Sequence, residues 1–266
     1  MCTSFVVKGD RTWIGMNFDI SAHPIKLVYQ KDSQLLVMQE EQGQFLPAFG
    51  INRKGTFMNL HMVEANAAGA YRRGKDCVHI MRLFEDVMGE KLAPAEVISF
   101  VNDHVIVNVP GHSVQSLVAG TDVACIVQPG KQVIDITPSD RQTLVLTNFS
   151  LSDAKEKDSP MSDAPGADRY RIVSERLASL QEELDVETSF SILKDAVQQG
   201  GDFPTQLSLV VLPEERLVHF ALHGNFAKTY CFSFDDRRIR TTKGFPSPKE
   251  CILTRKGLLI SELAGW

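Results

Sequence analysis

Apolar and polar residues alternate, or apolar residues gather in short runs, along most of the first 63 positions. Patterns of this kind are typical of β-strands, whose successive side chains point to opposite faces of a sheet. They predict strands over residues 3–7, 12–18, 26–29, 34–38, 45–51 and 56–63. The turn-like sequence Asn-Arg-Lys-Gly at 52–55 separates the last two strands.

After residue 76 the apolar spacing changes to three and four positions, which indicates helices. The first predicted helix carries Cys77, Ile80, Met81, Phe84, Val87 and Met88, with Asp76 as its expected N-cap. The second has Pro94 in its first turn and carries Val97, Ile98 and Val101. Strands are predicted again over residues 113–119, 123–127, 132–136 and 143–146.

Residues 150–168 are rich in Ser, Asp, Lys, Pro, Gly and Ala, a composition that predicts a surface loop. Two further helices are expected after it. One carries Ile172, Val173, Leu177, Leu180 and Leu184, and the other carries Phe190, Leu193, Ala196 and Val197 with Thr188 near its cap. Strands follow over residues 206–212, 217–222 and 229–234, and the charged cluster at 235–240 predicts a solvated turn.

The predicted elements come in the order strands, two helices, strands, two helices, strands. Segregated runs of this kind favour an α+β fold of mostly antiparallel sheets. A four-layer αββα sandwich would use every element, with two sheets face to face and a helix pair on each outer face. The 266 residues, 43% of them hydrophobic, are enough for a full core. We therefore expect one domain over residues 1–266.

Charge and composition exclude several classes of protein. The net charge of −5 argues against a dedicated nucleic-acid-binding protein, and no apolar run approaches the roughly 20 residues of a membrane span. The N-terminus lacks the pattern of a secretory signal, so a cytoplasmic location is expected. The five cysteines include no CxxC pair, which predicts neither a zinc site nor a disulfide framework. No cofactor and no metal is expected.

Cys2 is the candidate nucleophile because of its position. Removal of Met1, which is favoured when the next residue is small, would leave a thiol and a free α-amine on one residue. The ordinary pKa of an α-amine is about 8 and that of a thiol about 8.5, so the amine can take the thiol proton near neutral pH. The alternative is that a cysteine at this position is an accident of the sequence.

Asp19 ends the second predicted strand, in the sequence Gly15-Met16-Asn17-Phe18-Asp19. A hairpin of the first two strands would bring Asp19 close to Cys2, where a carboxylate could orient the amine. A turn-forming acid at a strand end is the alternative interpretation.

The chain resembles the choloylglycine hydrolases and penicillin V acylases, which are N-terminal-nucleophile hydrolases of linear carbon–nitrogen amide bonds. The resemblance rests on Met-Cys-Thr, Gly-x-Asn-x-Asp, Leu-Thr-Asn at 146–148 and Arg-Tyr at 169–170, with weaker similarity at 50–55 and 205–208. It implies that Cys2 is the nucleophile and Asp19 the acid beside it. It further implies that Asn148 is an oxyanion-hole amide and that Arg169 polarises the site. Asn148 could also be a plain turn residue.

The chain departs from that family at three places. Met16 stands where the family has an arginine, which removes a positive charge beside the thiol. The second oxyanion donor falls on Met62 in an ungapped register, or on Asn59 or His61 after a shift, so these three and Met16 are the candidate substrate-binding residues. The segment between Asn148 and Arg169 lacks the long hairpin of the bile-salt hydrolase tetramer. A different homo-oligomer is compatible with the sequence.

Two functions are compatible with these residues. The first is a hydrolase that cleaves the linear amide of a small N-acyl molecule through a thioester on Cys2. The second is a catalytically inactive relative that serves as a small-molecule binding or structural protein. The state of Met1 separates them, because the first requires a freed Cys2 amine.

Overall fold

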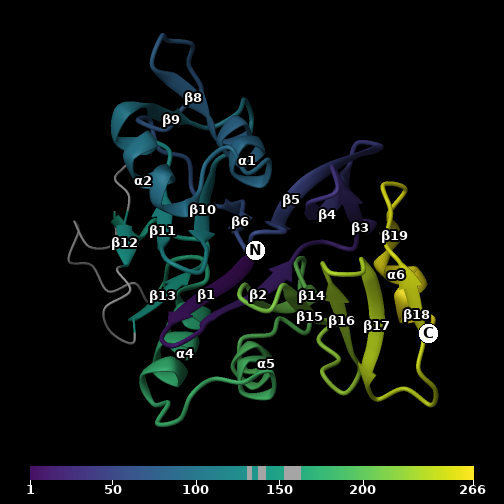
Figure 1. Cartoon of the computed structure of the whole chain (residues 1–266). Coiled ribbons are helices and arrows are strands. Elements are labelled where there is room, and N and C mark those ends of the chain that lie inside the picture. The colour runs from purple at the N-terminus through teal and green to yellow at the C-terminus, as the bar shows by residue number, and fades with distance from the viewer. Residues whose placement is uncertain (131–133, 137–141, 153–162) are drawn as a thin grey trace.

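Two large antiparallel sheets form the centre of the molecule (Figure 1). A computed structural model describes residues 1–130, 134–136, 142–152 and 163–266. The first sheet contains, in spatial order, β13 (Gln142–Leu146), β1 (Cys2–Lys8), β2 (Thr12–Asp19), β14 (Thr205–Leu212), β15 (Leu217–Leu222), β16 (Thr229–Ser233), β17 (Arg238–Lys243) and β18 (Glu250–Ile252). The second contains β12 (Ile134–Ile136), β11 (Ala124–Val127), β10 (Val114–Ala119), β6 (Phe57–Asn59), β5 (Gln44–Asn52), β4 (Gln34–Glu41), β3 (Ile25–Gln30) and β19 (Leu258–Leu259), with β7 (His61–Met62) paired to β10.

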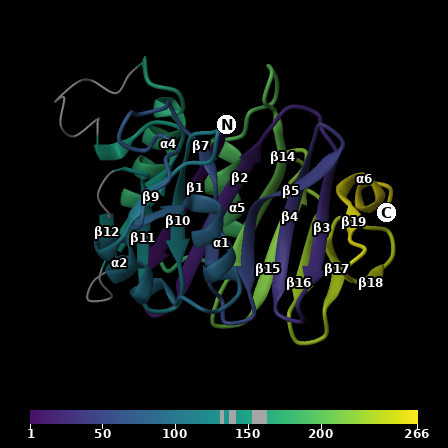
Figure 2. The same ribbon diagram turned by 90° about the horizontal axis from the view of Figure 1, so that it is seen from above.

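Helices cover the outer face of each sheet. Helices α4 (Ala167–Ala178) and α5 (Val186–Asp195) pack on the first sheet, and α1 (Ile80–Met88) and α2 (Pro94–Asp103) pack on the second. Figure 2 shows β3–β5 lying over β15–β17, and Tyr29 of β3 contacts Phe232 of β16 across the interface. Three clusters of buried apolar side chains fill the three interfaces between the layers. The predicted α+β αββα sandwich is therefore confirmed.

The period of two along β1 and β2 decides which layer each side chain meets. All seven residues of β1 are buried, because the strand lies inside a sheet that is covered on both faces. Cys2 and Val6 face the second sheet, whereas Phe5 and Val7 face α4 and α5. This alternation directs the Cys2 side chain between the two sheets.

Several element boundaries differ from the expectation. The strand expected over residues 56–63 is interrupted at Leu60, whose N–H donates to the carbonyl of Ala48, 3.0 Å away. The N-cap of α1 is His79 rather than Asp76, because residues 77–79 form the short strand β8 (Cys77–His79), which pairs in parallel with β9 (Val105–Val107). Thr188 lies near the cap of α5, as expected; the cap itself is Asp185, whose side chain accepts the Thr188 N–H at 2.6 Å.

The C-terminal segment contains structure that the hydrophobic pattern did not predict. The expected turn at 235–240 is wrong in part, since Arg238 and Arg240 belong to β17 and pair with Glu250 of β18. The short helix α6 (Ile260–Ala264) buries Leu263 in the core between the sheets. Of the strand expected over 132–136, residues 132–133 lie outside the described residues, as do 153–162 of the expected loop. No helix in the described part of the chain is long and apolar enough to cross a membrane.

Candidate active site

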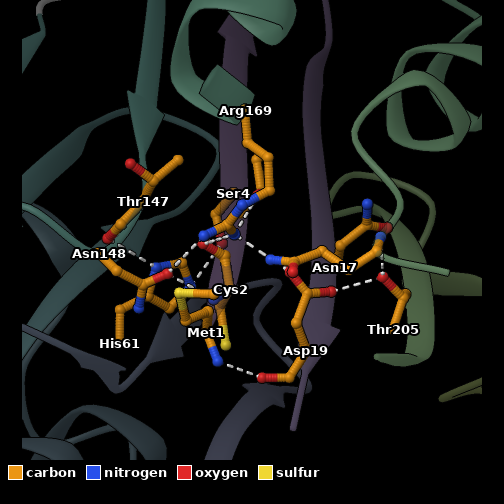
Figure 3. Close-up of polar contacts among 12 residues, drawn as sticks. Met1, Cys2, Ser4, Asn17, Asp19, His61, Thr147, Asn148, Arg169 and Thr205 are labelled. Atoms are coloured by element: carbon orange, nitrogen blue, oxygen red, sulfur yellow. Dashed lines mark hydrogen bonds and ion pairs between the residues drawn. The ribbon is translucent and has the colours of Figure 1, made fainter. Parts of the chain in front are cut away.

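The first two strands bring Cys2 and Asp19 together at one end of their hairpin. Cys2 pairs with Phe18 in the antiparallel register, so Asp19 lies just beyond Cys2 (Figure 3). The side chain of Cys2 faces the second sheet, while Asp19 points to the side of the sheet that carries the helices, because Phe18 and Asp19 point in opposite directions. The amine of Met1 donates a hydrogen bond to the main-chain carbonyl of Asp19.

Arg169 is a buried cation that links all the elements of the site. Its side chain comes from the first turn of α4 and is 4% exposed. Nη1 donates to the Cys2 carbonyl and to Thr3 Oγ1, both at 2.8 Å, and lies 3.1 Å from Asp19 Oδ2. Nη2 donates to Asn148 Oδ1 at 3.1 Å. The guanidinium therefore fixes β1, the end of β2 and the segment after β13 in one arrangement.

Asn148 holds the main-chain nitrogen of Cys2. Its Oδ1 accepts the Cys2 N–H at 2.7 Å, and its Nδ2 donates to the Met62 carbonyl at 2.7 Å. A primary amide carries two N–H hydrogens, so Nδ2 has a second donor beyond the one used by Met62. Asn148 can thus orient the Cys2 nitrogen and still offer a hydrogen to a substrate oxygen.

Asp19 is buried with a hydrogen-bond partner on each carboxylate oxygen. Thr205 Oγ1 donates to Oδ1 at 2.6 Å, and Arg169 lies at Oδ2. Burial nevertheless raises the pKa of Asp19 to about 6, because the hydrogen bond from Thr205 and the charge of Arg169 offset only part of the desolvation of the carboxylate. The carboxyl group therefore changes charge close to physiological pH.

The raised pKa of Asp19 predicts a specific dependence of stability on pH. Between about pH 4 and 6 the folded protein binds more protons at this group than the unfolded chain, so Asp19 lowers the free energy of unfolding as the pH rises. The loss should total about 3 kcal/mol by pH 7. Urea unfolding at pH 4, 5, 6 and 7 should show it as a falling difference between the wild type and Asp19→Asn. A difference that is constant with pH would contradict the raised pKa.

The thiol of Cys2 is unreactive while Met1 is attached. The Cys2 residue is 5% exposed, and burial raises the pKa of its thiol to about 11. At pH 7 this leaves about one thiolate in 10⁴ molecules. An activating group must therefore lie beside Cys2 before it can act as a nucleophile.

The absence of a side chain at Gly166 leaves space for the Arg169 guanidinium. It precedes α4 with φ +82°, and a Cβ there would lie 2.7 Å from Arg169 Nη2 and 3.0 Å from Thr147 Cβ. Gly166→Ala should lower the free energy of unfolding by about 2–5 kcal/mol, from left-handed backbone strain together with this clash.

Gly43→Ala is the matched control for that prediction. Gly43 has the same φ of +82°, but no atom lies within 4 Å of the position that a Cβ would take, so backbone strain alone should cost about 1–2 kcal/mol. Urea titrations of both variants measure the two effects. Equal losses would show that Arg169 is not confined by Gly166.

A second polar network lies behind Cys2, between the two sheets. Ser4 Oγ is 2.9 Å from His61 Nε2, and Asn59 Nδ2 donates to Ser4 Oγ at 2.9 Å. His61 Nδ1 lies 3.3 Å from the Thr147 carbonyl, which also accepts from Gln115 Nε2 at 2.9 Å. Because a carbonyl can only accept, Nδ1 of His61 carries the proton and Nε2 accepts from Ser4.

This network supports the segment that carries Asn148. Burial lowers the pKa of His61 to about 3, so the imidazole is neutral at physiological pH. The bond to the Thr147 carbonyl holds the residue directly before Asn148. Sequence reasoning missed the roles of Ser4, Gln115 and Thr205, since hydroxyl and amide side chains inside strands give no signal in a hydrophobic pattern.

A cavity of about 620 Å³ opens at Cys2. Cys2, Phe18 and Asp19 line its end next to the site, and Ala48, Leu60 and Met62 of the second sheet and its edge line it too. The cavity is large enough for a small organic molecule. No group of three or more His, Cys, Asp or Glu placed to hold a metal ion occurs among the described residues.

The cavity is next to only one of the four expected substrate-binding residues. Met62 lines it, but Met16, Asn59 and His61 do not. Met16 points into the core between the sheets. The side chains of Asn59 and His61 form hydrogen bonds with Ser4. The structure thus places Met16 in the core and Asn59 and His61 in the supporting network, outside the described lining of this cavity.

One further thiol lies close to a histidine. Cys231 Sγ is 3.8 Å from His219 Nε2, on neighbouring strands β16 and β15. Burial raises the pKa of this thiol to about 11 and lowers the pKa of His219, so both groups are kept neutral. The pair also lies outside the residues that line the cavity. Among the cysteines, Cys2 is the one in the described lining of this cavity.

Comparison with solved structures identifies the fold. The conjugated bile acid hydrolase of Clostridium perfringens matches 96% of this chain and 98% of its own, with a TM-score of 0.61 and 14% identity. The penicillin V acylase of Agrobacterium tumefaciens matches 91% of each chain, with a TM-score of 0.63 and 13% identity. The chain has the fold of the choloylglycine hydrolases and penicillin V acylases. An N-acylethanolamine-hydrolyzing acid amidase ortholog from Caenorhabditis elegans is also similar, over 80% of this chain and 93% of its own (TM-score 0.56, 15% identity).

No family model and no curated protein sequence matches the chain. The choloylglycine hydrolase fold therefore persists here at a sequence identity that sequence comparison did not detect. Within this fold, Cys2, Asp19, Asn148 and Arg169 meet at one end of the first sheet although they come from β1, β2, the segment after β13 and α4.

Proposed function

We propose that the chain is an amide hydrolase whose nucleophile is the thiol of Cys2 and whose general base is the α-amine that removal of Met1 exposes. The observation that carries the proposal is the 2.7 Å hydrogen bond between the Cys2 nitrogen and Asn148 Oδ1, at the end of a cavity that Cys2 itself lines. The nitrogen that would become the base is already oriented. The three amide hydrolases of the same fold support the same class of reaction.

The freed amine would supply the base that the buried Cys2 thiol, with its high pKa, needs before it can attack. It removes the Sγ proton as the thiolate attacks the carbonyl carbon of the substrate amide. The tetrahedral intermediate then expels the amine product, which takes the proton from the α-ammonium. The acyl group is left on Cys2 as a thioester. Attack by water, assisted by the same amine, breaks the thioester and yields a carboxylic acid and the free thiol.

The surrounding groups would stabilise charge at each step. The second N–H of Asn148 is available to the oxyanion, and one donor of this kind lowers the barrier by about 3–4 kcal/mol in well-studied enzymes. The main chain of Met62 is fixed beside it by the bond to Asn148. Arg169 would position the Cys2 main chain by its hydrogen bond to the Cys2 carbonyl. Asp19, at the end of the β1–β2 hairpin, would hold the Arg169 guanidinium in place. We propose these roles for the residues; the substrate is a small molecule with a linear amide.

A panel of amides tests this function directly. Protein that begins at Cys2 should release acid and amine from at least one of penicillin V, glycine-conjugated bile salts, N-acyl homoserine lactones, N-acyl amino acids and fatty-acid amides. Cys2→Ala should abolish the activity, whereas Cys231→Ala should retain it. Equal turnover by wild type and Cys2→Ala would refute the assignment.

The second candidate function is that of a non-catalytic binding protein. It is favoured by the high pKa of the Cys2 thiol when Met1 is present. In that case the cavity would bind amides without cleaving them, and Cys2→Ala would bind them as tightly as the wild type. Calorimetric titration together with product analysis separates the two.

A further inference from the structure

One side of the cavity follows the β4–β5 hairpin, from Cys2 and Ala48 past Leu46 to Glu41 and Gln42 at the hairpin tip. Residues of α1 and of the segment 109–114 line the cavity as well. Ala48 and Gln44, which pairs with Glu41, are four residues apart, a distance of about 13 Å along an extended strand. A ligand that starts at Cys2 and follows this side of the cavity therefore ends close to Glu41.

The wall between these two ends is apolar. Its side chains come from both sheets, from α1 and from loops: Phe18, Leu46, Leu60, Met62, Met81 and Phe203. Leu46, Met62 and Phe203 are 41%, 51% and 41% exposed, so the apolar surface continues out to the mouth of the cavity. Contiguous exposed apolar residues around a cavity indicate a surface that an apolar ligand covers.

The outer end of the cavity carries a carboxylate. Glu41 lies there, and neither lysine nor arginine is found among the described lining residues, whose nitrogen groups are the α-amine at the inner end and the imidazoles of His23 and His112. The ammonium group of the nearby Lys26 forms a cation–π contact with Phe45, with Nζ 4.1 Å from the ring centroid. Arg169 is buried and engaged by Cys2, Thr3, Asp19 and Asn148. A carboxylate at the far end of a ligand would lose hydration and meet Glu41 without a cationic partner.

The acyl half of a substrate suits this cavity better than the amine half. In the proposed reaction the acyl group stays bonded to Cys2 as the thioester while the amine departs. An enclosed apolar wall that begins at Cys2 would retain the acyl group and let the amine leave to water.

We infer, on the basis of the proposed function, that the cavity selects an acyl group that is apolar along about 13 Å and uncharged or positively charged at its far end, and that Glu41 excludes acyl groups ending in a carboxylate. Glu41 is thus a specificity-determining residue at the mouth of the cavity. Gln39 Nε2 donates to Glu41 and lines the same wall, which holds the carboxylate towards the ligand.

Glu40 provides a matched control on the neighbouring position of the same strand. Its side chain points the opposite way and does not line the cavity, although its partner His23, whose Nδ1 lies 3.9 Å away, does. Glu40→Gln and Glu41→Gln remove the same charge from adjacent residues. A difference between them therefore reports the position of the charge and not the net charge of the protein.

The experiment uses three amides of one fluorogenic amine, whose acyl chains have equal length and end in a methyl, an ammonium or a carboxylate group. We expect wild-type protein beginning at Cys2 to prefer the ammonium to the carboxylate amide by about tenfold or more in kcat/KM at low salt. Glu41→Gln should reduce the ratio about tenfold, Glu41→Lys should reverse it, and Glu40→Gln should leave it unchanged. Added salt should lower the wild-type ratio.

Binding of the same amides to Cys2→Ala, measured by calorimetry, keeps this inference separate from the proposed function. If the affinity is higher for the ammonium than for the carboxylate amide and this preference depends on Glu41, but the wild type turns over none of the amides, the hydrolase is overturned and the assignment of the cavity is upheld. Turnover with equal preference for all three amides, or equal effects of Glu40→Gln and Glu41→Gln, would overturn the assignment.

Discussion

Protein that retains Met1 is expected to hydrolyse amides at least about 10⁴-fold more slowly than protein that begins at Cys2, since losses of this size follow removal of the base or nucleophile in other hydrolases. With Met1 attached, the nitrogen of Cys2 is an amide and cannot accept a proton. The Met1 amine then donates a hydrogen bond to the main-chain carbonyl of Asp19, and the Met1 residue lines the cavity. The thiol keeps its pKa of about 11.

Cleavage of one fusion protein directly before Met1 or directly before Cys2 gives the two forms with identical remaining sequence. Steady-state kinetics with the most reactive amide measures the difference, and urea unfolding verifies that both forms are folded. Alkylation by iodoacetamide should be fast at Cys2 only in the shorter form. Equal rates of hydrolysis by the two forms would show that the α-amine is not the base.

Arg169→Met is expected to lower the free energy of unfolding by about 3–5 kcal/mol, the range for loss of one partner from a buried ion pair. The change leaves Asp19 buried without its cation and leaves the Cys2 carbonyl and Thr3 Oγ1 without their donor. It should also raise the pKa of Asp19 further, so the loss should be smaller at pH 4 than at pH 7.

Arg171→Met is the control on the same helix. Arg171 forms a solvent-exposed pair with Glu175 at 3.4 Å, and pairs of this kind contribute less than about 1 kcal/mol. Urea titrations at the two pH values compare both variants with the wild type. A loss at Arg169 no larger than that at Arg171 would contradict the view that Arg169 holds the site together.

Strand and helix periodicity was sufficient to predict the layers of this fold. The run Thr-Ser-Phe-Val-Val after Cys2 is buried on both faces, and α1 and α2 bury the apolar positions Phe84 and Val97 at the expected spacing. The hairpin that joins β1 to β2 follows from the same pattern and places Asp19 beside Cys2. These features are local, so a single sequence carries their signal.

The features that could not be predicted from sequence depend on contacts between distant segments. Thr205 reaches Asp19 across 186 positions, and Ser4 reaches His61 across 57. Met16 was expected in the pocket because it stands where the similar family has an arginine. It faces the second sheet like Cys2 and Phe18, but it lies further along the hairpin and packs in the core. The cap of α1 moved from Asp76 to His79 because the pairing of β8 with β9 overrides the local preference of Asp for an N-cap.

The most direct test of the Cys2 mechanism is mass spectrometry of protein that is acid-quenched while it turns over an amide. The mechanism predicts an intact mass lower by one methionine and increased by one acyl group, with the acyl group on the N-terminal peptide at Cys2. An acyl group on another residue, or turnover by a chain that still carries Met1, would contradict it.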